Sequence, residues 1–235
     1  MDEDNVLDFN FWPSFADLML SLVLILVLVL FLVTAAISIG TVNLNEVNQN
    51  QHKMIEEISN SYNTKAVEMG KDSKTFGIST NGSSNYDIRI KNEPTLQRIT
   101  FSDKILFKTG DYQLNETGKK VLTNVGVAIK NRLENIERIQ IEGHADNVPV
   151  NITNVQLAAN RAIAVFNFLK DTEDIKIDPA KHLMSVTSFG EFNSVQRNES
   201  TSKEQYDINQ LDKDNESEDK RSRNRRIELL LFYRR

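Results

Sequence analysis

The sequence predicts an α/β protein: a single N-terminal transmembrane helix, a juxtamembrane helix, and then an α/β sandwich in which helices cover one side of a mixed sheet. Three observations support this prediction: a long apolar run near the N-terminus, a polar stretch with a 3-4 apolar repeat after it, and strand patterns that alternate with helix patterns in the remainder. The length of 235 residues fits one globular domain with additions.

The apolar run predicts a retained membrane anchor. Between residues 18 and 36 the only polar side chains are Ser21 and Thr34. About 20 residues at a rise of 1.5 Å each match a hydrocarbon core of roughly 30 Å. The run is longer than the apolar core of a typical signal peptide, and no cleavage site of small residues follows it. We therefore predict a short tail over 1–13 and a transmembrane helix over 14–39.

A single carboxylate, Asp17, lies at the head of this apolar run. A charged group at bilayer depth is costly unless it faces protein or water, so such a residue suggests an ion or proton site. Ser14, Asp17 and Ser21 follow one another at spacings of three and four and share one helical face, which indicates a partner surface or a hydrated path. The alternative is a carboxylate at the level of the head groups, stabilised by the helix macrodipole.

Residues 40–85 are predicted to form a juxtamembrane helix and a linker. Apolar positions near a heptad spacing suggest a parallel helix pair with a second chain, and a solvated helix without a partner is the alternative. The positions concerned are Leu44, Val47, Gln51, Met54, Ile58 and Tyr62. Turn-forming residues between 70 and 85 indicate the linker.

Residues 86–235 alternate between the two periodicities, as expected for a sandwich of sheet and helices. We predict a mobile surface loop over 191–222, because its very polar composition offers no core. Strands are predicted at 86–91, 97–107, 138–142, 184–189 and 226–233, and helices at 115–133 and 154–170.

Composition and spacing argue against several classes of function. The net charge of −5 gives no overall case for nucleic-acid binding, and the arginines of 221–226 are offset by the acidic segment beside them. The absence of cysteine excludes disulfides, thiolate metal sites and cysteine nucleophiles. The three histidines, His52, His144 and His182, are scattered without ligand spacing, so no metal site is predicted.

Four segments of the C-terminal part resemble one family. Residues 143–150 read Gly-His-Ala-Asp-Asn-Val-Pro-Val, and residues 154–162 carry Asn-x-x-Leu-Ala-x-x-Arg-Ala. Residues 224–229 read Asn-Arg-Arg-Ile-Glu-Leu, and 107–114 carry Phe-x-x-Gly-x-x-x-Leu. Together they resemble the ordered motifs of OmpA-like peptidoglycan-binding domains, and the resemblance covers 86–235.

The membrane segment resembles a second module. Residues 12–19 carry Trp-x-x-Phe-Ala-Asp-Leu-Met, which is similar to the Trp-x-x-Tyr-Ala-Asp-Phe-Met motif of MotB-type stator subunits. The combination of this helix with an OmpA-like domain resembles the B subunit of an ion-driven motor complex and is more specific than either part.

The resemblance implies a membrane motor anchored to the cell wall. Two copies of this chain would sit within a ring of five MotA-like polytopic subunits, with Asp17 as carrier of a proton or sodium ion and Ser21 beside the ion path. One charge that moves through 100 mV supplies about 2.3 kcal/mol, so a few ions could drive a conformational cycle. The chain would cross the inner membrane once, with a cytoplasmic N-terminus and a periplasmic domain. No enzymatic activity and no resident cofactor are implied.

The same resemblance implies a ligand site in the domain. Carried over to this sequence, Asp146 and Arg161 would hold the two charged ends of a peptidoglycan diamino acid, because a carboxylate takes an ammonium and a guanidinium takes a carboxylate bidentately. Asn154 and Leu157 would support that pocket, and Arg225 is a further candidate for peptidoglycan binding.

Several departures from the family pattern bear on the output of the motor. Ala145 replaces the usual Thr, Pro13 stands where flagellar stator subunits carry Lys, and the segment 191–222 is longer than expected. These differences favour a relation to the MotAB-like pair of Zorya anti-phage systems. A flagellar stator subunit and a passive membrane-to-wall tether remain as alternatives. An enzyme acting on peptidoglycan is disfavoured, because no nucleophile with a base and an orienting partner is evident.

Overall fold

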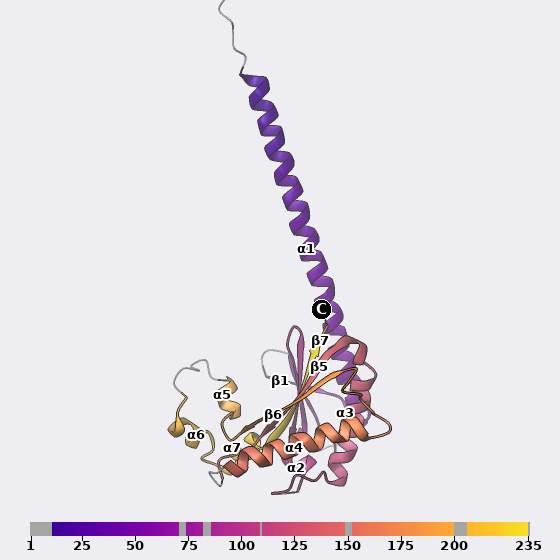
Figure 1. The fold of residues 1–235 in the computed structure, drawn as a ribbon, viewed down its shortest axis with the longest axis vertical. Helices are drawn as coiled ribbons and strands as arrows, with labels where there is room; N and C mark the ends of the chain where they lie inside the picture. The colour runs from indigo at the N-terminus through magenta and orange to yellow at the C-terminus, as the bar shows by residue number, and fades with distance from the viewer. Residues whose placement is uncertain are drawn as a thin grey trace, which may run out of the picture. The chain divides into compact units, whose positions relative to one another are not determined.

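The computed structural model describes residues 11–70, 74–81, 86–108, 110–148, 152–199 and 206–234, and the chain divides into two compact units, Met1–Asn45 and Glu46–Arg235. Figure 1 shows the order of the elements. The helices are α1 (Trp12–Asn60), α2 (Asp103–Leu106), α3 (Glu116–Lys130), the 3-10 turn η1 (Leu133–Asn135), α4 (Ile152–Asp171), α5 (Val195–Glu199), α6 (Ile208–Asp214) and α7 (Glu218–Asn224). The strands are β1 (Val67–Met69), β2 (Thr75–Ile78), β3 (Ile88–Asn92), β4 (Leu96–Ser102), β5 (Ile136–His144), β6 (Leu183–Gly190) and β7 (Arg226–Tyr233).

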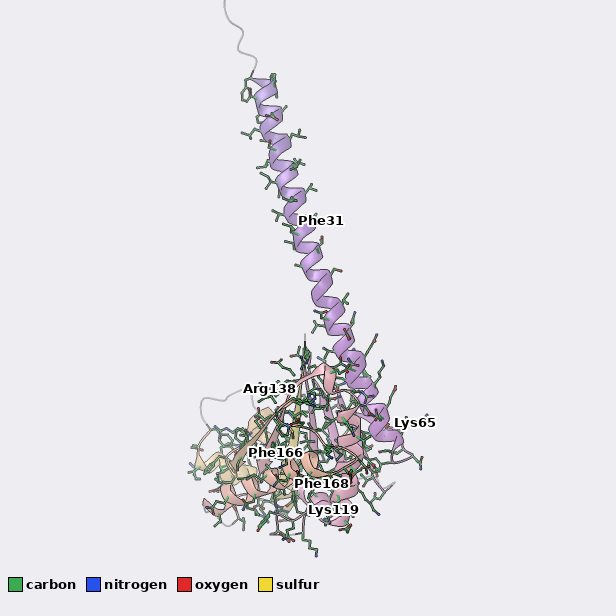
Figure 2. All side chains as sticks on the ribbon, turned by 45° about the vertical axis from the view of Figure 1, so that its right-hand side comes forward. Phe31, Lys65, Lys119, Arg138, Phe166 and Phe168 are labelled. Carbon is green, nitrogen blue, oxygen red and sulfur yellow. The ribbon has the colours of Figure 1, made fainter. Side chains whose placement is uncertain are left out.

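In the first unit, α1 carries the predicted apolar run. Its most apolar 18-residue window has a mean hydropathy of 3.2 and is 0% buried, so length and composition fit a membrane span. Large apolar side chains such as Phe31 project from the helix surface (Figure 2) and are exposed within the chain. The Ser21 and Thr34 hydroxyls donate to the carbonyls of Asp17 and Phe31, each at 2.9 Å, so the helix itself satisfies them.

The last part of α1 belongs to the second unit and packs into its core. Val47, Gln51, Met54 and Ile58 are at most 4% exposed. Gln51 Nε2 donates to the carbonyl of Glu93 at 2.9 Å. The prediction that this seam pairs with a second chain is therefore wrong at these four positions, because they face their own domain. The compact unit likewise begins well before the predicted boundary at residue 86.

The sheet is mixed, as predicted. Its seven strands run in the order β1-β2-β3-β4-β7-β5-β6, and β5 with β6 is the one parallel pair among the described strands. A parallel pair needs a crossover, and α4 provides it between β5 and β6. Figure 1 shows α4 crossing the strands. Strands β1 and β2 were not predicted; β2 lies in the predicted linker, where its pairing with β3 at one edge outweighs the local turn signals. The linker residues 71–73 and 82–85 lie outside the described residues.

Two glycines let the sheet approach α4 closely at one end. A Cβ on Gly143 of β5 would lie 2.1 Å from the carbonyl oxygen of Ala158 of α4, so a larger residue would push the helix away. Gly190 ends β6 with a φ of +53°, a backbone conformation that favours glycine, and its carbonyl accepts from the N–H of Ala145 at 2.7 Å. This geometry sets the loop after β5 beside α4.

The segment predicted as a mobile loop is largely built into the domain. It forms α5, α6 and α7, and Leu211 is 4% exposed. Asn224 is 1% exposed, and its Nδ2 donates to the carbonyl of Asp214 at 3.0 Å and to Oδ1 of Asn215 at 2.9 Å. The prediction of a loop without a core is therefore wrong over 206–222, because buried amides take the place of apolar side chains there. Residues 200–205 lie outside the described residues.

Candidate functional site

Arg161 of α4 is a buried cation held by the segment that follows β4. It is 2% exposed, and its Nε donates to the carbonyl of Asp111 at 2.9 Å. Its Nη1 donates to Oδ2 of Asp103 at 3.2 Å, and its guanidinium lies 5.3 Å from the ring centre of Phe107. A buried guanidinium is tolerated when it is paired and hydrogen-bonded in this way.

Asp146 lies just after β5 and is 6% exposed. Its Oδ1 accepts from the N–H of Val148 at 3.3 Å, and its Oδ2 accepts from Nη1 of Arg225. Nε of Arg225 lies 3.7 Å from Oδ2 of Asp103. Arg161, Asp103, Arg225 and Asp146 thus form a row of alternating charges, which we call the Asp146 network.

The structure brings the predicted pair into one network without pairing the two residues directly. Arg161 contacts Asp103, and Asp146 contacts Arg225. Sequence reasoning missed Asp103; the one local signal was an acidic residue between a strand and the Phe107 motif. Asn154 is 4% exposed, and its Nδ2 donates to Oε2 of Glu191 at 2.7 Å, a hydrogen bond that supports the turn after β6.

Leu157 of α4 is half-buried, one turn before Arg161 on the same helix. Of the motif at 143–150, Pro149 and Val150 lie outside the described residues.

Burial sets the electrostatics of the network. It raises the pKa of Asp103 above its usual value, although Arg161 and Arg225 oppose the shift. It also lowers the pKa of Arg161, against the attraction of Asp103. Oδ1 of Asp103 is buried and has no hydrogen-bond partner among the described residues. An incoming donor such as an ammonium group would therefore find an unsatisfied carboxylate oxygen here.

Helices α6 and α7 contact the residues around Asp146 through two hydrogen bonds. Nδ2 of Asn147 donates to Oδ1 of Asp212 on α6 at 2.9 Å. Nη2 of Arg225 donates to Oε1 of Glu218 on α7. Both contacts come from the segment 191–222, which was predicted to be a mobile surface loop.

A second charged cluster lies on β4, β5 and β7, where Glu142 faces Glu228 and His144 faces Arg226 in register. Glu142, His144 and Glu228 offer ligand atoms within 4.8 Å of one another, an arrangement that could hold a metal and that histidine spacing did not reveal. Arg98 already contacts Glu228 and lies 3.6 Å from Glu142, so a guanidinium provides the positive charge between the two carboxylates.

In the membrane segment, Asp17 and Ser21 lie one turn apart on α1, and the side chain of Asp17 is exposed within this chain. The Ser21 hydroxyl bonds the main-chain carbonyl of Asp17 rather than its carboxylate. The ion-carrier role of Asp17 and the ion-path role of Ser21 stay predictions.

Comparison with known proteins agrees with the fold. Residues 106–207 match the model of the OmpA family. A putative MotB-like protein from Desulfovibrio vulgaris is similar, at 20% identity and a TM-score of 0.54, over 81% of this chain and 99% of that one. The periplasmic domain of MotB (residues 64–256 of that protein) is similar at 16% identity and a TM-score of 0.50, over 72% of this chain and 79% of that one.

No curated protein matches the chain significantly. The family match includes Asp146, Asn154, Leu157 and Arg161, whereas Arg225 lies beyond it. The likeness to these two solved structures shows a shared fold. Residues 106–207 are therefore OmpA-like, and the domain that contains them has the fold of a MotB-like protein and of a MotB periplasmic domain.

Proposed function

We propose that this chain is the peptidoglycan-anchored B subunit of a MotAB-type, ion-driven membrane motor. The observation that carries the proposal is the presence, in one chain, of a lone carboxylate on an apolar helix and a buried network of alternating charges in an OmpA-like domain. The two solved structures compared above are described as a putative MotB-like protein and a MotB periplasmic domain.

The membrane part supports ion transport by its chemistry. Asp17 begins an apolar surface that is unburied within the chain, and a carboxylate at such a position is stable when a partner or water surrounds it. We infer a MotA-like polytopic partner around a dimer of this chain, with a proton or sodium ion carried by Asp17 and Ser21 beside the path. The change in charge of Asp17 would bias the partner ring between two conformations.

The wall-binding part supports recognition of a zwitterion. The ammonium of a diamino acid would bind the carboxylates of Asp146 and Asp103, and its carboxylate would bind Arg161 or Arg225. In this proposal the ligand's charges replace the internal pairing of Asp146 with Arg225, so binding would loosen the contacts of that arginine. Asn154 and Leu157 would hold α4 in place behind the pocket.

For the output of the motor we favour a Zorya-type anti-phage defence role, because Pro13 replaces the lysine of flagellar stators and the segment before β7 is enlarged. A flagellar stator subunit would use the same residues. A passive tether between the inner membrane and the wall would share the domain and need no titration of Asp17.

One substitution, Asp17→Asn, distinguishes the motor hypothesis from the tether hypothesis. The chain is co-purified with a candidate MotA-like polytopic subunit, reconstituted in liposomes, and assayed for proton and sodium flux. Asp17→Asn should abolish flux and leave complex formation intact, whereas Ser14→Ala on the same helical face should retain it. Normal flux through Asp17→Asn would reject the carrier role.

Wall binding is tested by sedimentation of the full chain with purified peptidoglycan. Asp146→Ala and Arg161→Ala should each lose most binding, and Lys119→Ala, an exposed residue of α3 labelled in Figure 2, should bind normally. Thermal melts accompany each variant, because Arg161 is buried. Unchanged binding by a folded Asp146→Ala variant would reject the site.

A further inference from the structure

A cavity of about 830 Å³ lies between the ends of β3 and β4, α3 and α7. None of its described lining residues belongs to the Asp146 network. Two adjacent arginines belong to different sites. Arg225 contacts Asp146 in the proposed wall-binding site, and Arg226 lines the cavity. The cavity is therefore separate from the proposed wall-binding site.

The floor of the cavity is a patch of hydrogen-bond donors on one sheet face. Arg89 on β3 is the direct cross-strand partner of Thr100 on β4, and Ser102 on β4 is the partner of Arg226 on β7. Thr100 and Ser102 are two residues apart and so point to the same face. Direct cross-strand partners have Cβ atoms about 4.5–5.5 Å apart, so Arg89 lies beside Thr100 and Arg226 lies beside Ser102.

Arg226 supplies the observation that points to a ligand. It is 3% exposed; its Nε donates to Oε1 of Glu228 at 2.8 Å and its Nη1 to the carbonyl of Asn193 at 3.2 Å. Its Nη2 is buried and has no hydrogen-bond partner among the described residues. An unpaired buried guanidinium donor is costly, and an acceptor bound in the cavity would satisfy it.

Positive charge dominates the rim, although the chain as a whole carries −5. Lys104, Lys120 and Arg223 line the cavity with the two floor arginines, against the acids Asp87 and Asp219. Both acids are engaged: Oδ2 of Asp87 accepts from the hydroxyl of Thr80 at 2.7 Å, and Asp219 lies 3.3 Å from Arg223.

We propose that this cavity binds a phosphate group carried on a larger molecule. Arginine and hydroxyl side chains that line one cavity from three strands suit an oxyanion with several acceptor oxygens better than a carboxylate with two. The volume lies within the range of ligand pockets and exceeds one phosphate, so the group would belong to a lipid head group or to a soluble or wall-borne phosphate. This site does not depend on the motor function.

The test uses the full chain in phosphatidylcholine nanodiscs and titrates inorganic pyrophosphate by calorimetry. Arg89→Gln should weaken binding roughly tenfold, as the loss of one charge-assisted contact does. Lys120→Gln on the rim should weaken it by a smaller factor that shrinks as salt rises. The matched control is Lys119→Gln, which removes the same charge one residue away and outside the cavity lining, and should bind as the unmodified chain does.

Three results would overturn the proposal: no binding at about 1 mM pyrophosphate, equal weakening by Lys119→Gln and Arg89→Gln, or citrate bound as tightly as pyrophosphate. A second arm separates the sources. Weaker pyrophosphate binding in nanodiscs with phosphatidic acid, but not with phosphatidylglycerol, identifies a lipid phosphomonoester as the natural ligand. Unchanged binding in both identifies a soluble or wall-borne phosphate.

Discussion

Glu228 on β7 should make the domain sensitive to acid in a defined pH range. Burial raises its pKa, but the neighbouring cations, Arg226 foremost, outweigh burial and lower the pKa to about 2, from 4.5. At 1.36 kcal/mol per unit, the ionised form contributes about 3 kcal/mol to the free energy of unfolding. Because the folded pKa is depressed, this contribution is present above pH 4.5 and is lost as the pH falls towards 2.

The assay is urea unfolding of residues 46–235, the compact unit with its own core, at pH 7 and at pH 3. At pH 7, Glu228→Gln should lower the free energy of unfolding by roughly 3–5 kcal/mol, because it leaves buried Arg226 with a lost ion-pair partner. At pH 3 the difference between the two proteins should be smaller.

The control is Glu116→Gln, which removes an exposed carboxylate on α3 and should change stability little at either pH. Asp103 acts in the opposite direction: burial raises its pKa, so its contribution is lost as the pH rises through the folded value. The same loss from Glu228→Gln at both pH values would refute the linkage argument.

Three further predictions concern packing. Met54→Ala should cost about 2–5 kcal/mol in urea unfolding of residues 46–235, because Met54 is 0% exposed in the core; a loss below 0.5 kcal/mol would show that this part of α1 does not dock. Gly143→Ala should destabilise the domain by more than about 1 kcal/mol and weaken wall sedimentation, since its Cβ would overlap the carbonyl of Ala158; unaltered melting would contradict the close approach. Leu211→Ala should lower the melting temperature, whereas Ile208→Ala, at an exposed position, should not. Equal effects of the two substitutions would show that α6 does not pack on the domain.

Sequence patterns predicted much of the fold because they report the local environment of each side chain. The alternation in 138–142 and the 3-4 spacing in 154–170 identified β5 and α4, and both elements have one face on the core. The heptad-like spacing of Val47, Gln51 and Met54 likewise identified a buried helix face. It did not identify the partner, because a period shows that a face is covered but not what covers it.

The candidate site was likewise predictable only in part. The motifs at 143–150 and 154–162 located Asp146 and Arg161, and the family match spans both residues. Their contacts with Arg225 and Asp103 could not be predicted, because these residues are 79 and 58 positions away in sequence and meet through the pairing of β4, β7 and β5. Local periodicity carries no information about such distant neighbours.

The sequence by itself determined the apolar run long enough to span a membrane, the lone carboxylate at its head, and the alternation of strands and helices in the domain, since each depends on neighbours along the chain. Only the tertiary structure decided which charges pair and which donor of Arg226 stays unsatisfied. The same holds for the helices before β7, which close over buried amides. Those outcomes depend on strand register and on burial, which change the energy of a charge more than its sequence neighbours do.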